Sequence, residues 1–164
     1  MAMKFEIPLG EESSYNDADH KCYCLSKKSD ITFEATGKSA GIFAEAGKLD
    51  EWIQHFLHGE GNNLGFANGL KLEPRIYHTP KLMKLEKFQR ICGFEVGMKW
   101  PVDEQGFNEK VDQVMKRYKT GWDMPPLIIG LHDGEYELND GNHRYEALRR
   151  LGIEEHWVII WETA

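Results

Sequence analysis

The sequence predicts an α+β fold, a small mixed β-sheet with flanking helices, and two observations carry this prediction. Segments of helical spacing and of strand spacing follow one another from residue 108 onward without the regular strand–helix–strand repeat of a parallel α/β protein. The 164 residues are 41% apolar and 12% aromatic, which suffices for one domain with a packed core but not for two large ones.

The first part of the chain, residues 1–75, is predicted to form an α+β extension packed on the same domain. Its expected elements are a strand at 5–7, a hairpin from 31–35 and 40–44, a helix at 51–58 and a loop at 59–69. The hairpin is predicted because two apolar segments flank the turn-like run Thr36–Ser39. The helix is predicted because Asp50 precedes apolar residues at helical spacing.

The second part, residues 76–164, is predicted to be the main α+β domain. Its expected elements are extended chain over 70–85, one helical turn at 86–91, a helix at 108–119, strands at 127–131 and 136–138, a helix from His143, and a strand at 157–161. Pro125 and Pro126 stop any helix before the first of these strands, and Asp133-Gly134 is a strong hairpin turn. The nearly all-apolar run 157–161 is typical of a strand buried on both faces.

The charge distribution favours a local anion site over a long nucleic-acid track. The net charge is −7, whereas affinity for nucleic acid comes from Lys and Arg that neutralise phosphates. Residues 71–99, however, contain seven basic residues and only three acidic ones. Nucleic acid is therefore a disfavoured partner, and a small anionic ligand is preferred.

The composition also indicates the cellular compartment in which the protein is expected. No segment approaches the roughly 18 apolar residues of a membrane span, and the acidic first twenty residues do not resemble a signal peptide. Three cysteines make a disulfide framework improbable, so a cytoplasmic protein is expected. The spacing His20-x-Cys22-x-Cys24 is poor for a structural zinc site, and no metal site is predicted.

The most informative motif is Asp140-Gly141-Asn142-His143-Arg144, which opens onto an amphipathic helical pattern. A short turn at a helix start offers free backbone N–H groups and the positive end of the helix dipole, and Arg144 adds a fork-shaped cation. The sequence therefore predicts a phosphate site here. The alternative is an ordinary loop and helix cap, in which Asp and Asn are chosen for turn chemistry.

Two further sequence patterns, a pair of basic residues and a P-loop-like run, also have simpler explanations. Arg90 and Lys99 lie in the basic stretch and are predicted to neutralise phosphate charge, although basic surface residues are common. The run Gly37-Lys38-Ser39 ends like a P-loop, but the first Gly of that motif would fall at Thr32, so a hairpin turn is the better interpretation.

Residues 76–162 resemble the ParB/sulfiredoxin superfamily. The resemblance lies in Pro126-Leu-Ile-Ile, Asp133-Gly-Glu-Tyr-Glu-Leu, Asp140-Gly-Asn-His-Arg, Ala147-Leu-x-x-Leu-Gly152 and Val158-Ile-Ile. It implies a nucleotide (ATP, ADP or CTP) with Mg²⁺, held at the turn by Gly141, Asn142, His143 and Arg144. It also implies a role for Asp140 as a base or metal contact, and one for Glu95, which stands about where a serine kinase of the superfamily has its essential Glu. The alternative for Glu95 is a solvated glutamate in a loop.

Two departures from the superfamily limit what the resemblance implies. Sulfiredoxin has its catalytic Cys where this chain has Asn142, and an amide cannot act as a thiolate nucleophile. Partition proteins continue into a helix-turn-helix DNA domain, which these 164 residues do not contain. Neither sulfinic acid repair nor DNA partitioning is therefore expected.

The sequence as a whole predicts a protein that binds a nucleotide or a phosphorylated small molecule. Phosphoryl transfer or nucleotide hydrolysis is the enzymatic version of this hypothesis, with Asp140, Glu95 and His143 as candidate catalytic residues. A ParB-like nucleic-acid-binding or nuclease-type domain is the first alternative. A non-enzymatic interaction module is the second. The acceptor and the oligomeric state are not predicted.

Overall fold

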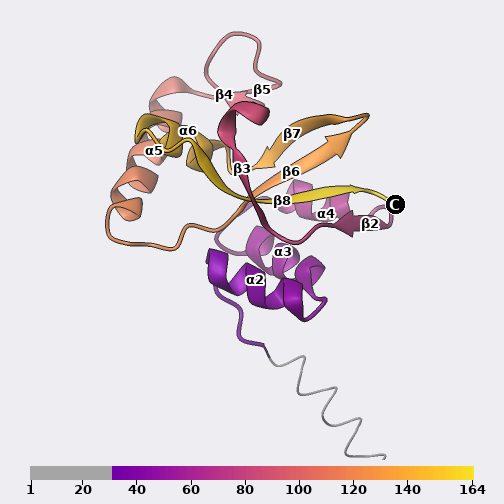
Figure 1. Cartoon of the computed structure of the whole chain (residues 1–164). Helices are drawn as coiled ribbons and strands as arrows, with labels where there is room; N and C mark the ends of the chain where they lie inside the picture. Colours follow the sequence, from indigo (N-terminus) through magenta and orange to yellow (C-terminus); the bar gives the residue numbers. More distant parts are fainter. Residues whose placement is uncertain (1–30) are drawn as a thin grey trace, which may run out of the picture. The chain divides into compact units, whose positions relative to one another are not determined.

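The computed structural model of the chain describes residues 31–164. The chain divides into two units, residues 1–32 and 33–164, and the second unit is the α+β body described below (Figure 1). The strand expected at 5–7 and the His20, Cys22 and Cys24 pattern lie outside the described residues.

The hairpin predicted at 31–44 is wrong, because this segment contains helix α2, Gly37–Glu45. Thr36 is its N-cap and accepts a hydrogen bond from the Ser39 N–H at 3.1 Å. The turn-like residues are therefore a helix start, since Thr is a favourable N-cap and Gly and Ser are tolerated in a first turn. Ala40 and Phe43 then lie one turn apart and are both buried.

Two more helices follow in the region predicted as one helix and a loop. Helix α3, Leu49–His58, confirms the predicted helix, but Lys48 is its N-cap and Asp50 lies in its first turn. The loop predicted at 59–69 is partly wrong because α4, Leu64–Leu70, lies within it. Asn63 caps α4 by accepting the Phe66 N–H at 3.3 Å. Of the Gly and Asn residues that indicated a loop, Asn63 is the cap of this short helix and Gly65, Asn68 and Gly69 lie within it.

The sheet is mixed and is centred on β8, Glu155–Thr163. β8 pairs antiparallel with β2 (Arg75–Tyr77) and β3 (Lys81–Lys84), and parallel with β6 (Leu127–His132). β6 pairs antiparallel with β7, Glu135–Asp140. Asp133 and Gly134 join β6 to β7 with φ values of 51° and 80°, as a type I′ turn requires. The predicted α+β class and this hairpin are confirmed.

The remaining elements complete the body. They are the 3₁₀ turn η1 (Leu85–Lys87), the short strands β4 (Cys92–Gly93) and β5 (Trp100–Pro101), helix α5 (Glu104–Tyr118) and helix α6 (Asn142–Arg150). α5 starts four residues earlier than predicted because Asp103 caps it through the Gly106 N–H, at 2.7 Å. α6 begins within one residue of the predicted start.

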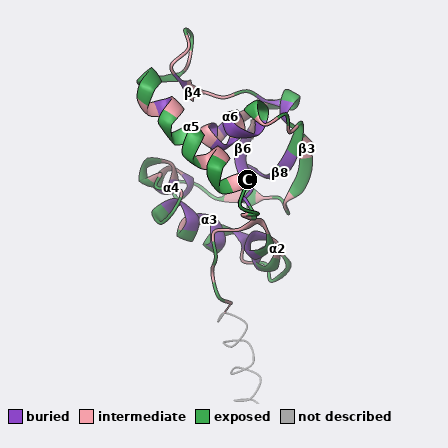
Figure 2. Ribbon diagram, turned by 90° about the vertical axis from the view of Figure 1, so that its left-hand side faces the viewer, coloured by how far each residue is buried: buried purple, intermediate pink, exposed green. Residues whose placement is uncertain are grey.

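Helices cover both faces of the sheet. On one face, Leu148 of α6 packs with the alternate strand residues Leu127, Ile129, Val158 and Ile160. On the other face, Phe66 of α4 lies 6.0 Å from the Trp161 ring. Figure 2 shows buried residues along the helix sides that face the sheet. Trp157 is half exposed, so the predicted two-sided burial of 157–161 holds from Val158 onward.

None of the helices in residues 31–164 is both long enough and apolar enough to cross a membrane.

Candidate functional site

The turn between β7 and α6 forms the start of the candidate site. Gly141 is the N-cap of α6 with φ of 106°, a left-handed conformation, and it offers no side chain to cap the helix. Within the described chain, the N–H groups of Asn142, His143 and Arg144 have no hydrogen-bond acceptor. The first turn of α6 therefore presents three free backbone donors at the positive end of the helix dipole.

A cavity of about 1070 Å³ lies at this helix start. Its walls are formed by the end of α3 through α4, the β4–β5 region, one face of α5, the segment between α5 and β6, the end of β7, and the turn itself. The lining residues that the sequence had indicated are Lys99, Asp140, Gly141, Asn142, His143 and Arg144. Arg90 and Glu95 are not among its lining residues.

Arg90 and Glu95 belong instead to an internal ion-pair network. Arg90 donates hydrogen bonds to the Cys92 carbonyl at 2.8 Å and to the Glu95 carboxylate, and lies 3.4 Å from Glu146. Its guanidinium also stacks 4.7 Å from the Phe107 ring centre. The hydrogen bond from Arg90 lowers the pKa of Glu95, so this carboxylate is a weak base.

Asn142 is buried and its side chain holds the neighbouring segment in place. Its Oδ1 accepts the backbone N–H groups of Ile91 and Cys92, at 2.9 and 3.0 Å. The amide of this residue thus joins the start of α6 to β4, while its own backbone N–H remains at the cavity. Both lone pairs of Oδ1 are thus engaged, whereas Nδ2, the group of this side chain that could donate to an anion, has no hydrogen bond within the described chain.

Arg144 and Asp140 form a buried pair behind the turn. Arg144 donates to the carbonyls of Pro125 and Pro126, at 2.7 and 2.9 Å, and to Asp140 Oδ2 at 2.9 Å. The other carboxylate oxygen of Asp140 accepts from Asn63 Nδ2 at 3.0 Å. Burial raises the pKa of Asp140, and Arg144 and Asn63 oppose this shift.

His143 lines the cavity with a half-buried imidazole. Its ring lies 4.8 Å from the Phe107 ring, and it has no hydrogen bond within the described chain. Burial, followed by the positive charges of Lys110, Arg90 and Arg144, lowers its pKa to about 4. The imidazole is therefore neutral at pH 7.

This pKa predicts a pH dependence of stability. Unfolded His143 titrates near 6.5 and folded His143 near 4, so between these values the unfolded state binds more protons and stability is lost as pH falls. After allowance for solvent screening, the loss is roughly 1–2 kcal/mol between pH 7 and pH 4. Urea unfolding of wild type and His143→Gln at both pH values isolates this contribution. Equal pH slopes for the two proteins would contradict it.

The site contains residues that the sequence analysis did not select. Lys110, Gln113, Val114 and Arg117 line the cavity from one face of α5, at the spacing of successive helical turns. Arg117 pairs with Glu60 and stacks 4.0 Å from the Trp122 ring. Lys110 has no ion pair within the described chain, and its charge is among those that act on His143. The spacing of Lys110 and Arg117 places them on one face of the helix, but it does not indicate that this face lies at the cavity.

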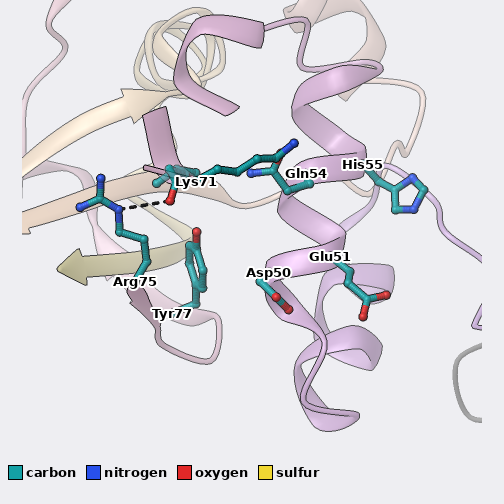
Figure 3. Close-up of a pocket in the computed structure, with 8 residues that line it drawn as sticks. Asp50, Glu51, Gln54, His55, Lys71, Arg75 and Tyr77 are labelled. Carbon is teal, nitrogen blue, oxygen red and sulfur yellow. Dashed lines mark hydrogen bonds between the residues drawn. The ribbon is translucent and has the colours of Figure 1, made fainter. Parts of the chain in front are cut away.

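A second, smaller cavity of about 420 Å³ lies at the other end of α4 (Figure 3). Asp50 and Gln54 of α3 and Tyr77 of β2 line it. Arg75 lines it too, but its guanidinium is engaged with the carbonyls of Gly69 and Leu70, at 3.1 and 3.3 Å, and stacks on Trp161. Arg75 therefore satisfies carbonyls that the end of α4 leaves free.

Three solved structures illustrate what the fold resembles. Sulfiredoxin from Arabidopsis thaliana matches with 26% identity over 51% of this chain and 84% of its own, at a TM-score of 0.40. A Pnob8-like ParB-N domain matches with 17% identity over 57% of this chain and 33% of its own, also at 0.40. A C-terminally truncated SbnI from Staphylococcus aureus matches with 22% identity over 52% of this chain and 30% of its own, at 0.35.

By their names, two of these structures are a sulfiredoxin and a ParB-N domain, and each of the three likenesses covers about half of this chain. No protein-family model and no curated protein matches the sequence.

Proposed function

We propose that the protein binds a phosphate-bearing small molecule, with a nucleotide as the preferred ligand, at the start of α6. The observation that carries this proposal is the set of three free N–H groups, from Asn142 to Arg144, at the wall of a large cavity. Free helix N-termini bind phosphate because the donors and the dipole both favour an anion. A cavity of about 1070 Å³ is also large enough for a nucleotide.

The charges in the cavity support an anionic ligand that meets Lys110. Three cavity cations, Lys99, Arg117 and Arg144, have carboxylate partners in Glu137, Glu60 and Asp140. Lys110 is the cavity cation without such a partner in the described chain. Its ammonium group can therefore approach a phosphate without giving up an existing ion pair.

The same geometry favours binding over catalysis. Of the three side chains predicted as catalytic, Glu95 is not at the cavity and Asp140 has both oxygens engaged, which leaves the neutral His143. The described residues contain no cluster of His, Cys, Asp and Glu that fits a metal ion, and the cavity carboxylates are paired with cations. These residues do not fit a protein-held Mg²⁺, and no step of the proposal depends on one.

Calorimetric titration with pyrophosphate, ATP, ADP and CTP tests the proposal, each with and without Mg²⁺. At least one of these ligands is expected to bind, and the comparison between pyrophosphate and the nucleotides shows what the base contributes. Product release measured in the same samples tests for phosphoryl transfer or hydrolysis. Absence of binding by all four ligands would overturn the proposed function.

Replacing Lys110 with glutamine is expected to weaken the binding of the best of these ligands by roughly tenfold to a hundredfold. The reason is the loss of a charge-assisted hydrogen bond, which contributes about 1.5–3 kcal/mol. Lys116→Gln is the matched control, since Lys116 is exposed on the same helix and does not line the cavity. Equal affinities for the two variants would show that Lys110 does not contact the ligand.

A further inference from the structure

Asn63 connects helix α4, which precedes the sheet in the chain, to the turn at residues 140–144. It lies outside the region that resembles the ParB/sulfiredoxin superfamily, at the N-cap of α4. Its Oδ1 accepts the Phe66 N–H at 3.3 Å, and its Nδ2 donates to Asp140 Oδ1 at 3.0 Å. One amide side chain thus caps the start of α4 and holds one carboxylate oxygen of the buried Asp140 beside the candidate site.

The position of Asp140 gives this contact its importance. Asp140 directly precedes the N-cap Gly141, so the free N–H groups of the first turn of α6 follow it by only two to four residues in the chain. Asp side chains near a helix start readily accept hydrogen bonds from such groups. A carboxylate that did so here would occupy the donors that a phosphate requires, and would repel it.

Both oxygens of Asp140 are instead directed elsewhere. Arg144 holds Oδ2 at 2.9 Å and Asn63 holds Oδ1 at 3.0 Å. The carboxylate is only 7% exposed, so the protein's own donors, more than solvent, must replace a lost partner. Without Asn63, Oδ1 would lack this donor, and the unpaired N–H groups of residues 142–144 are donors that could replace it.

Helix α4 is placed firmly enough to hold Asn63 in this position. Gln54 Nε2 donates to the Ala67 carbonyl at 3.0 Å, in the middle of the helix. Arg75 donates to the carbonyls of Gly69 and Leu70 at its end. Because a seven-residue helix has little stability of its own, these contacts determine where its N-cap lies.

We propose that Asn63 is a positioning residue that keeps Asp140 away from the start of α6 and so leaves the N–H groups of residues 142–144 free for phosphate. This inference rests on the proposed function. Asn63 also lines the cavity, and the role proposed for it acts through Asp140.

Two substitutions separate this role from helix capping. Asn63→Asp and Asn63→Ser both retain a favourable N-cap for α4, but neither provides the Nδ2 donor. In Asn63→Asp, a second carboxylate faces Asp140, and the two share a proton once the pH is low enough, which restores a donor. Asn68→Ser is the matched control, because Asn68 is exposed on the same helix.

The measurement is an NMR titration of the full chain with sulfate, which remains a dianion from pH 8 to pH 5. At pH 8, both Asn63 variants are expected to bind sulfate roughly tenfold or more weakly than wild type. Relative to wild type, Asn63→Asp regains affinity as the pH falls to 5, whereas Asn63→Ser does not. A structural defect alone would not give this difference in pH profile.

Amide hydrogen exchange in the same ligand-free samples gives a second readout. In Asn63→Ser, the His143 and Arg144 amides are expected to exchange more slowly, because Asp140 then accepts from them. Unchanged exchange together with wild-type sulfate affinity would overturn the role of Asn63. If wild type binds neither sulfate nor any nucleotide, the proposed function fails, and the inference about Asn63 fails with it. If wild type binds and the Asn63 variants bind equally well, only the inference about Asn63 fails and the proposed function is unaffected.

Discussion

Replacing Arg144 with methionine is expected to destabilise the folded protein by roughly 3–5 kcal/mol at pH 7, because it leaves the carboxylate of Asp140 buried without its cation. It also leaves the carbonyls of Pro125 and Pro126 without the donors that now satisfy them. Urea unfolding at pH 7 measures the loss. Arg149→Met is the control, since Arg149 is largely exposed and its loss is expected to cost less than about 1 kcal/mol.

The pH dependence of this variant identifies the cause. Burial already raises the pKa of Asp140 in the folded protein, and removal of Arg144 takes away the main opposing charge. Because the pKa of Asp140 in the folded variant lies above its unfolded value, the folded state binds more protons at pH values between the two. The variant therefore regains stability relative to wild type as the pH falls. The double variant Asp140→Asn/Arg144→Met, which lacks both charges, is expected to recover much of the loss. A loss no larger than that of Arg149→Met would contradict the buried-pair explanation.

The second half of the chain was predictable because its local signals agree with one another. Pro125-Pro126, the Asp133-Gly134 turn and the apolar run from Val158 all fit the same succession of strand, hairpin strand, helix and strand, and the structure contains this succession. In the first half, the signals around residues 36–69 are ambiguous. Short apolar runs with Gly, Ser and Asn fit a turn, a loop or a helix cap equally well, and tertiary packing decides among them.

The sequence indicated the turn around which the candidate site is built, but not the detail of its side chains. The turn at residues 140–144 lies at the cavity, and its backbone is available because Gly141 leaves the start of α6 uncapped. Whether Asn142 and Arg144 face a ligand or the protein depends on the carbonyls and N–H groups packed behind them. Those partners come from the segments around residues 91 and 125, so no local pattern indicates them.

Lys110 and Asn63 were missed for the same physical reason. Lys110 is one of several lysines on an exposed amphipathic helix, and its spacing does not show which face lies at the cavity. Asn63 stood in a segment interpreted as a loop, and its partner Asp140 is 77 residues away. Long-range contacts of this kind follow from the packing of elements, which periodicity within one element does not specify.

Gly141 is the position at which a single added methyl group is expected to affect both the fold and the candidate site. Its φ of 106° is unfavourable for any residue with a Cβ, and an added Cβ would lie 2.6 Å from Leu127 Cδ2 and 3.0 Å from Arg144 Nη2. Leu127 is fully buried in the core strand β6 and has little room to move. Gly141→Ala is therefore expected to cost roughly 2–5 kcal/mol, as the sum of backbone strain and overpacking.

Gly152 provides a matched control for the backbone contribution alone. It also has a positive φ, 77°, at the opposite end of α6, but an added Cβ would meet nothing within 4 Å. Gly152→Ala should therefore show only the strain of the left-handed conformation, about 1–2 kcal/mol, and should leave ligand affinity unchanged. Gly141→Ala should lose more stability than Gly152→Ala in urea unfolding. It should also bind the best phosphate ligand more weakly in calorimetry, measured under conditions where it is still folded. The reason is that the clash with Arg144 and Leu127 displaces the N–H groups of residues 142–144. If the two alanine variants are equally stable and bind equally well, the close packing behind Gly141 does not hold the turn in place, and the free start of α6 must be maintained by Asn142 and its hydrogen bonds to β4 instead.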